Sequence, residues 1–236
     1  MKFMKLIKHF DFTNDSELDL NYWNIRVGDK WANNEKQHYV DKLENLYFDE
    51  GLVIQGTLKE GVYESSRIDT KGKFFFKYAR IDVQLKLPKG SGTWPAVWLM
   101  SEEGKYGHWP KSGEIDLVEH IGRNLDNVFF CLHSEVHNHR LKKYYYKDYQ
   151  EVGLSNNLNT FSLLWEENAI TYYLNDKEIV KYEKGKNGFD PSHKGWPFNE
   201  DFYLIINLAL GGGLGGPIDD SCFPQKFIIK DIKIYQ

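Results

Sequence analysis

Strict alternation of apolar and polar residues in the segment 80–87 is the feature that most constrains the fold of this chain. Four apolar residues alternate there with four polar or charged ones, in the order RIDVQLKL. Because successive side chains of a β-strand point to opposite faces of the sheet, the segment predicts a strand with one buried face. The same alternation recurs at 161–165 and 170–174, and polar residues at 166–168 and 175–177 supply turns. These segments predict a β-meander.

Five more short segments are rich in β-branched and aromatic residues, and Gly, Pro, Asn or Asp stands between most of them. They are 52–58, 94–100, 128–133, 202–210 and 227–235. The chain shows no convincing amphipathic helix, no internal repeat and no Pro/Ser-rich linker. Many short strands without helices predict an all-β fold of two packed sheets, a sandwich or jelly roll. At this length, residues 1–236 are expected to form a single domain.

Charge and composition exclude several classes of partner. The chain has 30 basic and 34 acidic side chains, a formal net charge of -4, and no dense run of like charge. We therefore expect no nucleic-acid binding and a neutral partner. No apolar run approaches the roughly 18–20 residues that span a bilayer, so we expect no membrane association. The N-terminal MKFMKLIKHFDF lacks the apolar stretch and cleavage site of a signal peptide.

Composition does not decide whether the aromatic residues form a core or stack on a ligand, or whether the cysteines form a disulfide. The chain has 7 Trp, 15 Tyr and 15 Phe, flat apolar faces that serve a core or a stacked ligand equally well. Cys131 and Cys222 are the only cysteines, too few for a disulfide framework. The sequence does not decide whether they pair.

Two further motifs resemble ligand sites only superficially. The glycine-rich segment 211–216 is expected to be a loop between two strands, because nothing after it opens a helix as a phosphate loop requires. Glu135, His137 and His139 alternate on one face of an extended segment, but no further ligand is apparent for zinc. Neither motif predicts a site.

The segment GEIDLVEHIG places three carboxylates, Glu114, Asp116 and Glu119, within six positions. A glycine stands at each end of a stretch shorter than most stable helices, which favours a strand. On a regular strand Glu114 and Asp116 share a face, and Glu119 points to the other. A β-bulge at Leu117 or Val118 would take up one extra residue and return Glu119 to the first face. Such a row of acids predicts a concave, water-filled sheet face.

Two carboxylates on one face suit glycoside hydrolysis, in which one attacks the anomeric carbon and the other protonates the leaving oxygen, then activates water. A third acid between them can accept a hydrogen bond or share a proton, which helps to keep the nucleophile ionised and the acid protonated. In a retaining enzyme the two groups lie about 5–5.5 Å apart, a distance that residue order does not give. A solvated acidic strand face, with or without a metal, is the alternative that this segment leaves open.

GEIDLVEHIG resembles the active-site motif of glycoside hydrolase family 16, in the laminarinase-like branch written E-I-D-x-x-E, whose extra residue is a β-bulge. The licheninase branch, E-x-D-x-E, has one residue fewer. Four more segments resemble the family: WANNEKQHYV, YARIDVQLKLPKGSGTWPAVWLM, DFYLIINLALGG and FPQKFIIKDIKIYQ. The resemblance covers about residues 10–236. It implies a curved two-sheet β-jelly roll with a substrate cleft along its concave face, forming one catalytic domain over residues 1–236.

The resemblance also implies a role for each acid of the motif in retaining endo-hydrolysis of a β-linked polysaccharide. By position, Glu114 is the nucleophile, Glu119 the general acid/base and Asp116 the assisting carboxylate. This agrees with the bulge expected from the residue count. No cofactor is expected for catalysis.

Sugar contacts are expected from aromatic faces and a few polar groups. The resemblance implies these contacts for five residues, Asn34, Trp94, Trp98, Trp109 and His133. The alternatives are core packing for each tryptophan, a turn for the asparagine, and a buried, hydrogen-bonded state for the histidine.

A structural calcium on the convex side is a further implication of the resemblance. The matching residues are Asp11, Gly51 and Asp231, an oxygen-rich set of the kind that calcium prefers. The alternative is a strand aspartate that holds no ion.

Two departures from the family pattern concern sugar specificity rather than the chemistry. Gln84 stands where many relatives carry arginine, and Leu214 stands where many laminarinases place a tryptophan. We interpret the chain as an endo-acting β-glucanase that cuts β-1,3- or mixed β-1,3/1,4-glucan with retention. The alternatives are the same chemistry on a β-galactan such as agarose or porphyran, a transglycosylase, and a non-catalytic glycan-binding module.

The expected partner is a β-glucan polysaccharide or oligosaccharide, bound by a monomer. Because polymeric glucans rarely enter cells intact, we expect the protein to be secreted, periplasmic or on the cell surface, although the N-terminal segment shows no signal.

Overall fold

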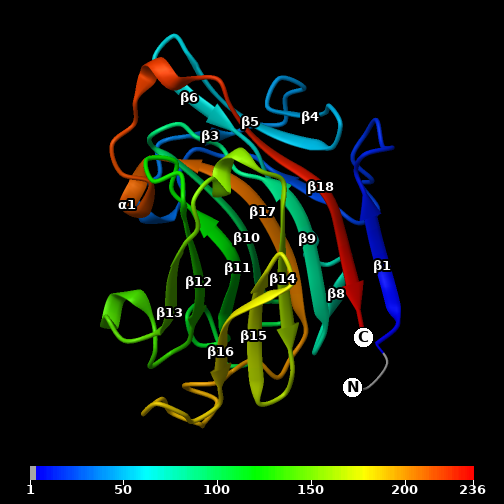
Figure 1. The fold of residues 1–236 in the computed structure, drawn as a ribbon, viewed down its shortest axis with the longest axis vertical. Coiled ribbons are helices and arrows are strands. Elements are labelled where there is room, and N and C mark those ends of the chain that lie inside the picture. The colour runs from blue at the N-terminus through cyan, green and yellow to red at the C-terminus, as the bar shows by residue number, and fades with distance from the viewer. Residues whose placement is uncertain (1–3) are drawn as a thin grey trace.

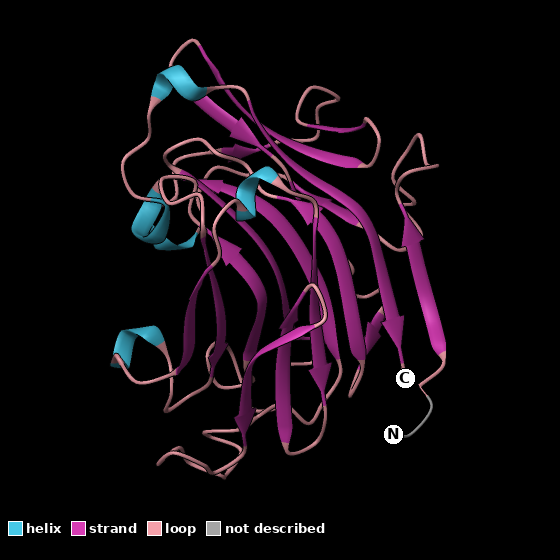
Figure 2. Cartoon of the chain, viewed as in Figure 1, coloured by secondary structure: helices cyan, strands magenta, loops and turns pink. Residues whose placement is uncertain are grey.

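The computed structural model describes residues 4–236, in which eighteen strands form two packed sheets (Figures 1 and 2). Residues 1–3, the start of the segment considered above as a signal peptide, lie outside the described range. Within that range, no helix is long and apolar enough to cross a membrane. The predicted all-β, two-sheet fold is confirmed.

The ten-stranded sheet, called the back sheet here, follows the spatial order β16 (Lys177–Glu183), β15 (Ala169–Leu174), β14 (Asn159–Trp165), β9 (Arg80–Lys86), β18 (Gln225–Tyr235), β5 (Leu52–Lys59), β6 (Val62–Ser65) and β3 (His38–Tyr39), with β1 (Leu6–Asp11) beside β18 and β4 (Leu46–Phe48) beside β5. Its pairs are antiparallel except β3 with β6.

The eight-stranded sheet, called the cleft sheet here, follows the order β13 (Tyr145–Gln150), β12 (Asn127–His133), β11 (Glu114–His120), β10 (Thr93–Ser101), β17 (Phe202–Leu210), β7 (Arg67–Asp69) and β2 (Asn24–Arg26), with β8 (Phe75–Phe76) beside β17. All its pairs are antiparallel. The helical pieces are short: α1 (Gly212–Gly215) and four 3-10 turns, Ala32–Asn34, His139–Leu141, Leu154–Asn156 and Asp220–Cys222.

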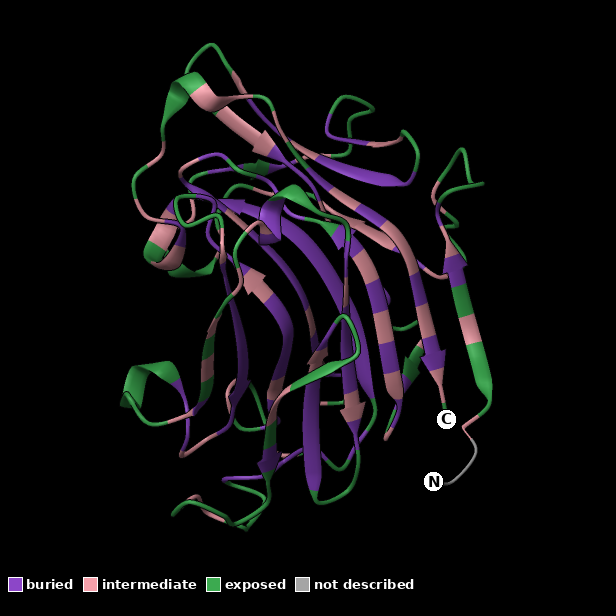
Figure 3. Ribbon diagram, in the orientation of Figure 1, coloured by how far each residue is buried: buried purple, intermediate pink, exposed green. Residues whose placement is uncertain are grey.

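The core lies between the two sheets and accounts for the two kinds of strand sequence. In β9 the apolar residues are buried and the polar ones are not, as the alternating pattern predicted. In β12 and β17 every residue is buried (Figure 3). One face of such a strand packs in the core while loops and neighbouring side chains cover the other, which explains their near-continuous apolar sequence.

The predicted strands 161–165 and 170–174 are confirmed as β14 and β15, and β16 extends them into a three-stranded meander. Its second turn places Asn175 and Asp176 at positive φ, 49° and 64°. Two consecutive positive φ values are typical of the tight hairpin turn whose twist matches that of the strands, and Asn and Asp tolerate them well. The polar pair therefore fixes the register of this hairpin.

The glycine-rich segment departs from the sequence expectation. Residues 212–215 form one helical turn, α1, and not only a loop. The turn packs against the 3-10 turn at Ala32–Asn34, and a Cβ on Gly212 would lie 2.9 Å from the carbonyl oxygen of Asn33. Glycine allows this close backbone approach, which the local sequence pattern did not reveal.

Candidate active site

A β-bulge in β11 sets the geometry of the three acids. Asp116 lies opposite Trp98 of β10, whereas Val118 lies opposite the adjacent Val97, so Leu117 is the extra residue. The pairing with β12 shows the same shift, between Asp116 and Glu119. The bulge predicted at Leu117 or Val118 is confirmed.

The bulge brings all three acids to one cavity on the cleft sheet. The cavity measures about 350 Å³, and Glu114, Asp116 and Glu119 all line it. Leu117, between them, is fully buried in the core. The remaining lining consists of Trp31, Ala32, Asn33, Glu35, Arg67, Trp94, Ala96, Trp98, Met100, Trp109, His139, Arg140, Asn207 and Ala209. A concave site with aromatic walls and a few convergent polar groups is typical of small-ligand binding.

Burial governs the protonation of the acids. It raises the pKa of Glu114 from an ordinary 4.5 to about 8, and the charge of Asp116 contributes in the same direction. Burial also raises the pKa of Asp116 well above its usual range, with the Glu119 charge as the second cause. The pKa of Glu119 is raised by burial as well, against the hydrogen bond from Trp94. Burial therefore favours the protonated form of all three acids, the form that a general acid needs before it can donate a proton.

His133 lies against the acids. Its Nε2 is 3.3 Å from Oδ2 of Asp116 and 3.7 Å from Oε1 of Glu114. Its ring stacks on Tyr144, with centroids 5.0 Å apart. With only 5% of its surface exposed, His133 is not among the residues that line the cavity, although the sequence predicted it as a sugar contact.

Two of the predicted tryptophans are held by hydrogen bonds through their indole edges. Trp94 Nε1 donates to Oε1 of Glu119 at 2.9 Å. Trp98 Nε1 donates to Oδ1 of Asn207 at 2.7 Å, and Asn207 Nδ2 donates in turn to the hydroxyl of Tyr39 at 2.9 Å. Fixed edges leave the ring faces in defined orientations at the cavity wall.

Trp109, the third predicted tryptophan, also lines the cavity. It comes from the loop before β11 and is covered by residues of the loop after β12. The guanidinium of Arg140 lies 4.6 Å from its ring centroid, and the His139 ring lies 5.5 Å away. All three tryptophans are thus at the cavity, and their contact with a sugar stays a prediction.

Asn34 is placed differently from the expectation. It is exposed and does not line the cavity, whereas its neighbours Asn33 and Glu35 do. Asn33 and Asn34 both have positive φ, 61° and 59°, so the chain turns sharply at this point. This local turn directs the two asparagines to different surroundings.

Several cavity residues were not identified from the sequence. Arg67 lies between the rings of Trp31 and Trp98, with its guanidinium carbon 4.9 Å from each centroid. Glu35 accepts hydrogen bonds from Gln37 Nε2 at 2.8 Å and from a tyrosine hydroxyl at 3.3 Å, and burial raises its pKa. Glu35 belongs to the NNE segment noted above and could have been named from it. Arg67 and Arg140 carried no comparable signal, and His139 was considered only as a zinc ligand.

Of the residues predicted for calcium, Asp11 and Asp231 lie in strands of the back sheet, and Gly51 directly precedes β5 of that sheet. Asp11 and Asp231 are direct partners across β1 and β18. Asp11 accepts hydrogen bonds from Thr13 and Asn14, and Asp231 Oδ2 lies 3.5 Å from Lys233 Nζ and 4.0 Å from His9 Nε2. Like charges directly opposite each other destabilise a strand pair, and here protein cations offset them in part.

Cys131 and Cys222 do not pair with each other; both thiols are free. Cys131 is buried in β12 opposite Asp116, whereas Cys222 lies partly exposed in the 3-10 turn Asp220–Cys222. Burial raises the pKa of the Cys131 thiol well above its usual range.

Comparisons with known proteins agree with this geometry. The model of Glycosyl hydrolases family 16 matches residues 29–208. A beta-glucanase of Rhodothermus marinus is 30% identical over 225 residues, which cover 91% of this chain and 79% of that protein. A glucan endo-1,3-beta-glucosidase A1 of Niallia circulans is 33% identical over 261 residues, which cover 99% of this chain and 38% of that longer protein. The crystal structure of a laminarinase from Flavobacterium sp. UMI-01 matches with a TM-score of 0.91 at 32% identity, covering 98% of this chain and 100% of the other.

Proposed function

The chain belongs to glycosyl hydrolase family 16, and from this premise we propose that it is a retaining endo-β-glucanase acting on β-1,3- or mixed β-1,3/1,4-glucan. The observation that carries the proposal is the bulge at Leu117, which brings Glu114, Asp116 and Glu119 into one aromatic-walled cavity. The named relatives, which are glucanases and a laminarinase, support the glucan assignment.

The reaction has two steps, with Glu114 as nucleophile and Glu119 as general acid/base. First, the Glu114 carboxylate attacks the anomeric carbon while Glu119 gives its proton to the glycosidic oxygen; the bond from carbon to that oxygen breaks and a glycosyl ester forms. Then the Glu119 carboxylate takes a proton from water, whose oxygen attacks the same carbon and releases Glu114. Two inversions at one carbon leave its configuration unchanged.

In this mechanism Asp116 helps to keep the nucleophile, Glu114, in its ionised form. It is the most buried of the three acids, at 3% exposed, and its pKa is raised well above the usual range, mainly by burial. A proton on Asp116 removes the charge that helps to raise the pKa of Glu114. Protonated Asp116 therefore allows Glu114 to ionise at a lower pH and favours the attacking form.

A charged β-galactan is the second candidate substrate, because two arginines line the cavity. Arg67 and Arg140 could pair with sulfate groups, which bind guanidinium well. Both guanidinium groups instead lie over tryptophan rings, a placement that is equally compatible with a neutral sugar. The three relatives compared above are named as glucanases or a laminarinase, which favours glucan over this alternative.

Parallel digestion of laminarin, lichenan, agarose and porphyran tests the proposal, with products sized and the anomer of the first product followed by NMR. We expect internal cleavage of laminarin or lichenan, with the β-anomer appearing first. Glu119→Gln is the inactive control, because it keeps the shape and removes the ionisable group. Cleavage restricted to agarose or porphyran would make the enzyme a galactanase. Binding without any release of reducing ends would make it a binding module, and products longer than the substrate a transglycosylase.

We also propose a structural calcium ion at Asp11, Asp231 and the carbonyl oxygen of Gly51. The donors are all oxygen atoms, and the facing aspartates have like charges that a cation would neutralise. The Gly51 carbonyl already accepts a hydrogen bond from the Asp49 amide at 2.9 Å, so it would be shared. The ion would join β1 to β18 far from the acids and has no part in the chemistry.

Two further expectations remain proposals. We infer action outside the cytoplasm, because a polymeric glucan rarely enters cells intact. We infer a monomer, because Glu114, Asp116 and Glu119 all come from one strand, β11, so a single chain can assemble the three acids. Fractionation of cells and light scattering of the purified protein test them separately.

A further inference from the structure

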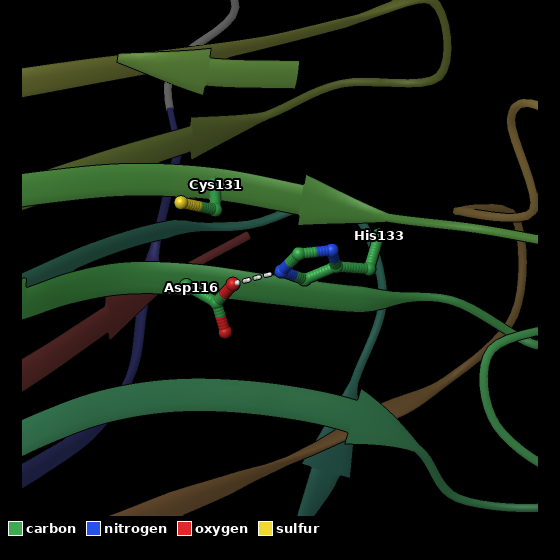
Figure 4. Close-up of side chains that lie close together, drawn as sticks. All are labelled: Asp116, Cys131 and His133. Carbon is green, nitrogen blue, oxygen red and sulfur yellow. Dashed lines mark ion pairs between the residues drawn. The ribbon is translucent and has the colours of Figure 1, made fainter. Parts of the chain in front are cut away.

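One cavity acid, Asp116, adjoins two side chains, Cys131 and His133, to which the proposed mechanism assigns no step. Asp116 of β11 and Cys131 and His133 of β12 come from adjacent strands and lie close together (Figure 4). One ligand atom from each, a carboxylate oxygen, Sγ and an imidazole nitrogen, lies within 4.8 Å of the other two. In residues 4–236 this is the one group of three His, Cys, Asp or Glu side chains arranged in this way.

The three donors match the preferences of a borderline-soft divalent cation. Thiolate sulfur, imidazole nitrogen and carboxylate oxygen are the ligands of zinc in proteins. Ligand atoms around a tetrahedral zinc ion lie about 3.3–3.8 Å apart, given bonds of about 2.0–2.3 Å. His133 Nε2 is already 3.3 Å from Asp116 Oδ2 and 3.7 Å from Glu114 Oε1. Small side-chain shifts would bring the oxygen, sulfur and nitrogen atoms of the three residues to these distances. Glu114 or water would be the fourth ligand.

An unsatisfied acceptor points independently to a ligand at this place. Asp116 is 97% buried, and its Oδ2 accepts no hydrogen bond; its ion-pair contact is His133 Nε2 at 3.3 Å, itself one of the three donors (Figure 4). Buried carboxylate oxygens are costly when they are left without a partner. Among residues 4–236, no lysine or arginine forms an ion pair with Glu114, Asp116 or Glu119. A divalent cation between Asp116 and His133 would bind this oxygen directly and take the place of the missing hydrogen bond.

We propose that Asp116, Cys131 and His133 form a binding site for a zinc-class divalent cation, and that occupation of this site inhibits the enzyme. An ion there takes the Asp116 carboxylate as a ligand and places a double positive charge beside Glu114. Because Oε1 of Glu114 lies 3.7 Å from His133 Nε2, the cation also holds the Glu114 carboxylate and keeps it from attacking the anomeric carbon. Asp116 lines the cavity, which gives the ion its path inward. The inhibitory effect rests on the proposed function, whereas the binding does not.

Cobalt(II) tests the binding directly on the full chain, because a Co(II)–thiolate bond has a near-ultraviolet charge-transfer band. We expect this band to saturate at one equivalent of Co(II) and to be displaced by Zn(II). Cys131→Ser removes the sulfur at nearly constant volume and should abolish the band, as should Cys131→Ala. Cys222→Ser, which changes the other, partly exposed cysteine, is the matched control and should keep it. A missing band in the wild type, or one retained in both Cys131 variants, would overturn the proposal.

Inhibition is then measured as release of reducing ends against Zn(II) concentration, with each variant compared with its own metal-free rate. Loss of one ligand should raise the inhibitory concentration at least about tenfold in Cys131→Ser but not in Cys222→Ser, and EDTA should restore the wild-type rate. Equal sensitivity of Cys131→Ser and wild type would overturn inhibition through this site. If the protein cleaves no glycan at all, the proposed function fails, while the cobalt titration still decides whether the site exists.

Discussion

Trp94 on β10 donates a hydrogen bond of 2.9 Å from its Nε1 to Oε1 of Glu119 on the adjacent strand β11. The bond favours the ionised form of Glu119, whereas burial, the larger effect, favours the neutral form. Trp94 therefore has two roles. Its ring lines the cavity, and its indole N–H lowers the pKa of Glu119, the proposed acid/base.

Trp94→Phe should keep much of the aromatic face and remove this donor. Because a hydrogen bond to a charged group contributes about 1.5–3 kcal/mol, its loss should raise the apparent pKa of the alkaline limb of kcat/KM by about one unit. Looser orientation of Glu119 should also lower kcat/KM at the optimum, by about tenfold. A full pH profile of kcat/KM measures both effects.

Trp98→Phe is the matched control for that profile. Its Nε1 bonds Asn207 and not an acid, so this substitution should raise KM while the pH limbs stay in place. An alkaline limb that moves equally in both variants, or in neither, would contradict the role assigned to the Trp94 bond.

The roles of the two glutamates can be separated by azide rescue. Glu114→Gly and Glu119→Ala should each lower the rate on polymeric glucan by more than about a thousandfold, since each removes a group that forms or breaks a bond. With an activated aryl β-glycoside, azide should enter the space that the Glu114 side chain vacates, on the face opposite the leaving group, and give an α-glycosyl azide. In Glu119→Ala, azide should attack the glycosyl ester and give the β-glycosyl azide.

NMR of the two azide products decides the assignment. Products of the opposite configuration would exchange the roles of Glu114 and Glu119. Turnover of the aryl glycoside by Glu114→Gly without azide, at a rate near that of the wild type, would remove Glu114 as nucleophile.

The pKa of Glu114 makes a separate prediction about stability. Its pKa is about 8 in the folded protein, raised mainly by burial from an ordinary 4.5. Below pH 4.5 both the folded and unfolded chains hold the proton, so burial of the neutral acid has its full benefit. As pH rises from 4.5 to 8, the unfolded chain loses the proton first, and the free energy of unfolding falls.

Glu114→Gln removes this titration. It should match the wild type in unfolding free energy near pH 4.5 and exceed it at pH 8 and above, by an amount of order 2–4 kcal/mol. Urea unfolding at several pH values measures the difference. Glu166→Gln, at an exposed glutamate between β14 and β15, is the control and should show the same pH dependence as the wild type. A constant offset between Glu114→Gln and wild type at all pH values would contradict the argument.

The parts of this structure that the sequence predicts are those set by local periodicity and residue count. Alternation in β9, β14 and β15 follows from one buried sheet face, and the spacing from Asp116 to Glu119 is enough to require a bulge. Both are properties of the strand itself, so neither needs knowledge of distant segments.

The parts that it does not predict depend on contacts between distant segments. Arg67 reaches the cavity because Trp31 and Trp98 enclose it, and those two residues are far apart in the chain. Arg140 reaches the cavity from the loop after β12, where its guanidinium lies 4.6 Å from the centroid of the Trp109 ring. The exposure of Asn34 depends on consecutive positive φ values that no periodicity indicates.

Gly122, directly after the catalytic strand β11, should tolerate no side chain. A Cβ there would lie 2.1 Å from both the carbonyl oxygen of Gly90 and Oγ1 of Thr93. Because backbone as well as side chain must move, Gly122→Ala should lower the free energy of unfolding by about 3 kcal/mol, measured by urea unfolding. Gly213→Ala is the matched control: its nearest neighbour would be 3.8 Å away, and the change should stay within about 0.5 kcal/mol. Equal effects of the two substitutions would contradict the packing described around β11.

Calcium at the back sheet should be detected as a change in melting temperature. The facing carboxylates of Asp11 and Asp231 have like charges, which Lys233 and His9 offset in part, so an added cation should stabilise the pairing of β1 with β18. If calcium is present at about a hundred times its Kd, the gain is about 2.7 kcal/mol, which corresponds to a rise of about 5–10 °C over EDTA for a chain of this size. Asp231→Asn should lose most of that rise, whereas Asp176→Asn, at an aspartate with 90% of its side chain exposed, should keep it. Equal melting temperatures in calcium and EDTA would mean that the residues of the back sheet hold no calcium, and that Lys233 and His9 supply all the neutralisation that Asp231 receives.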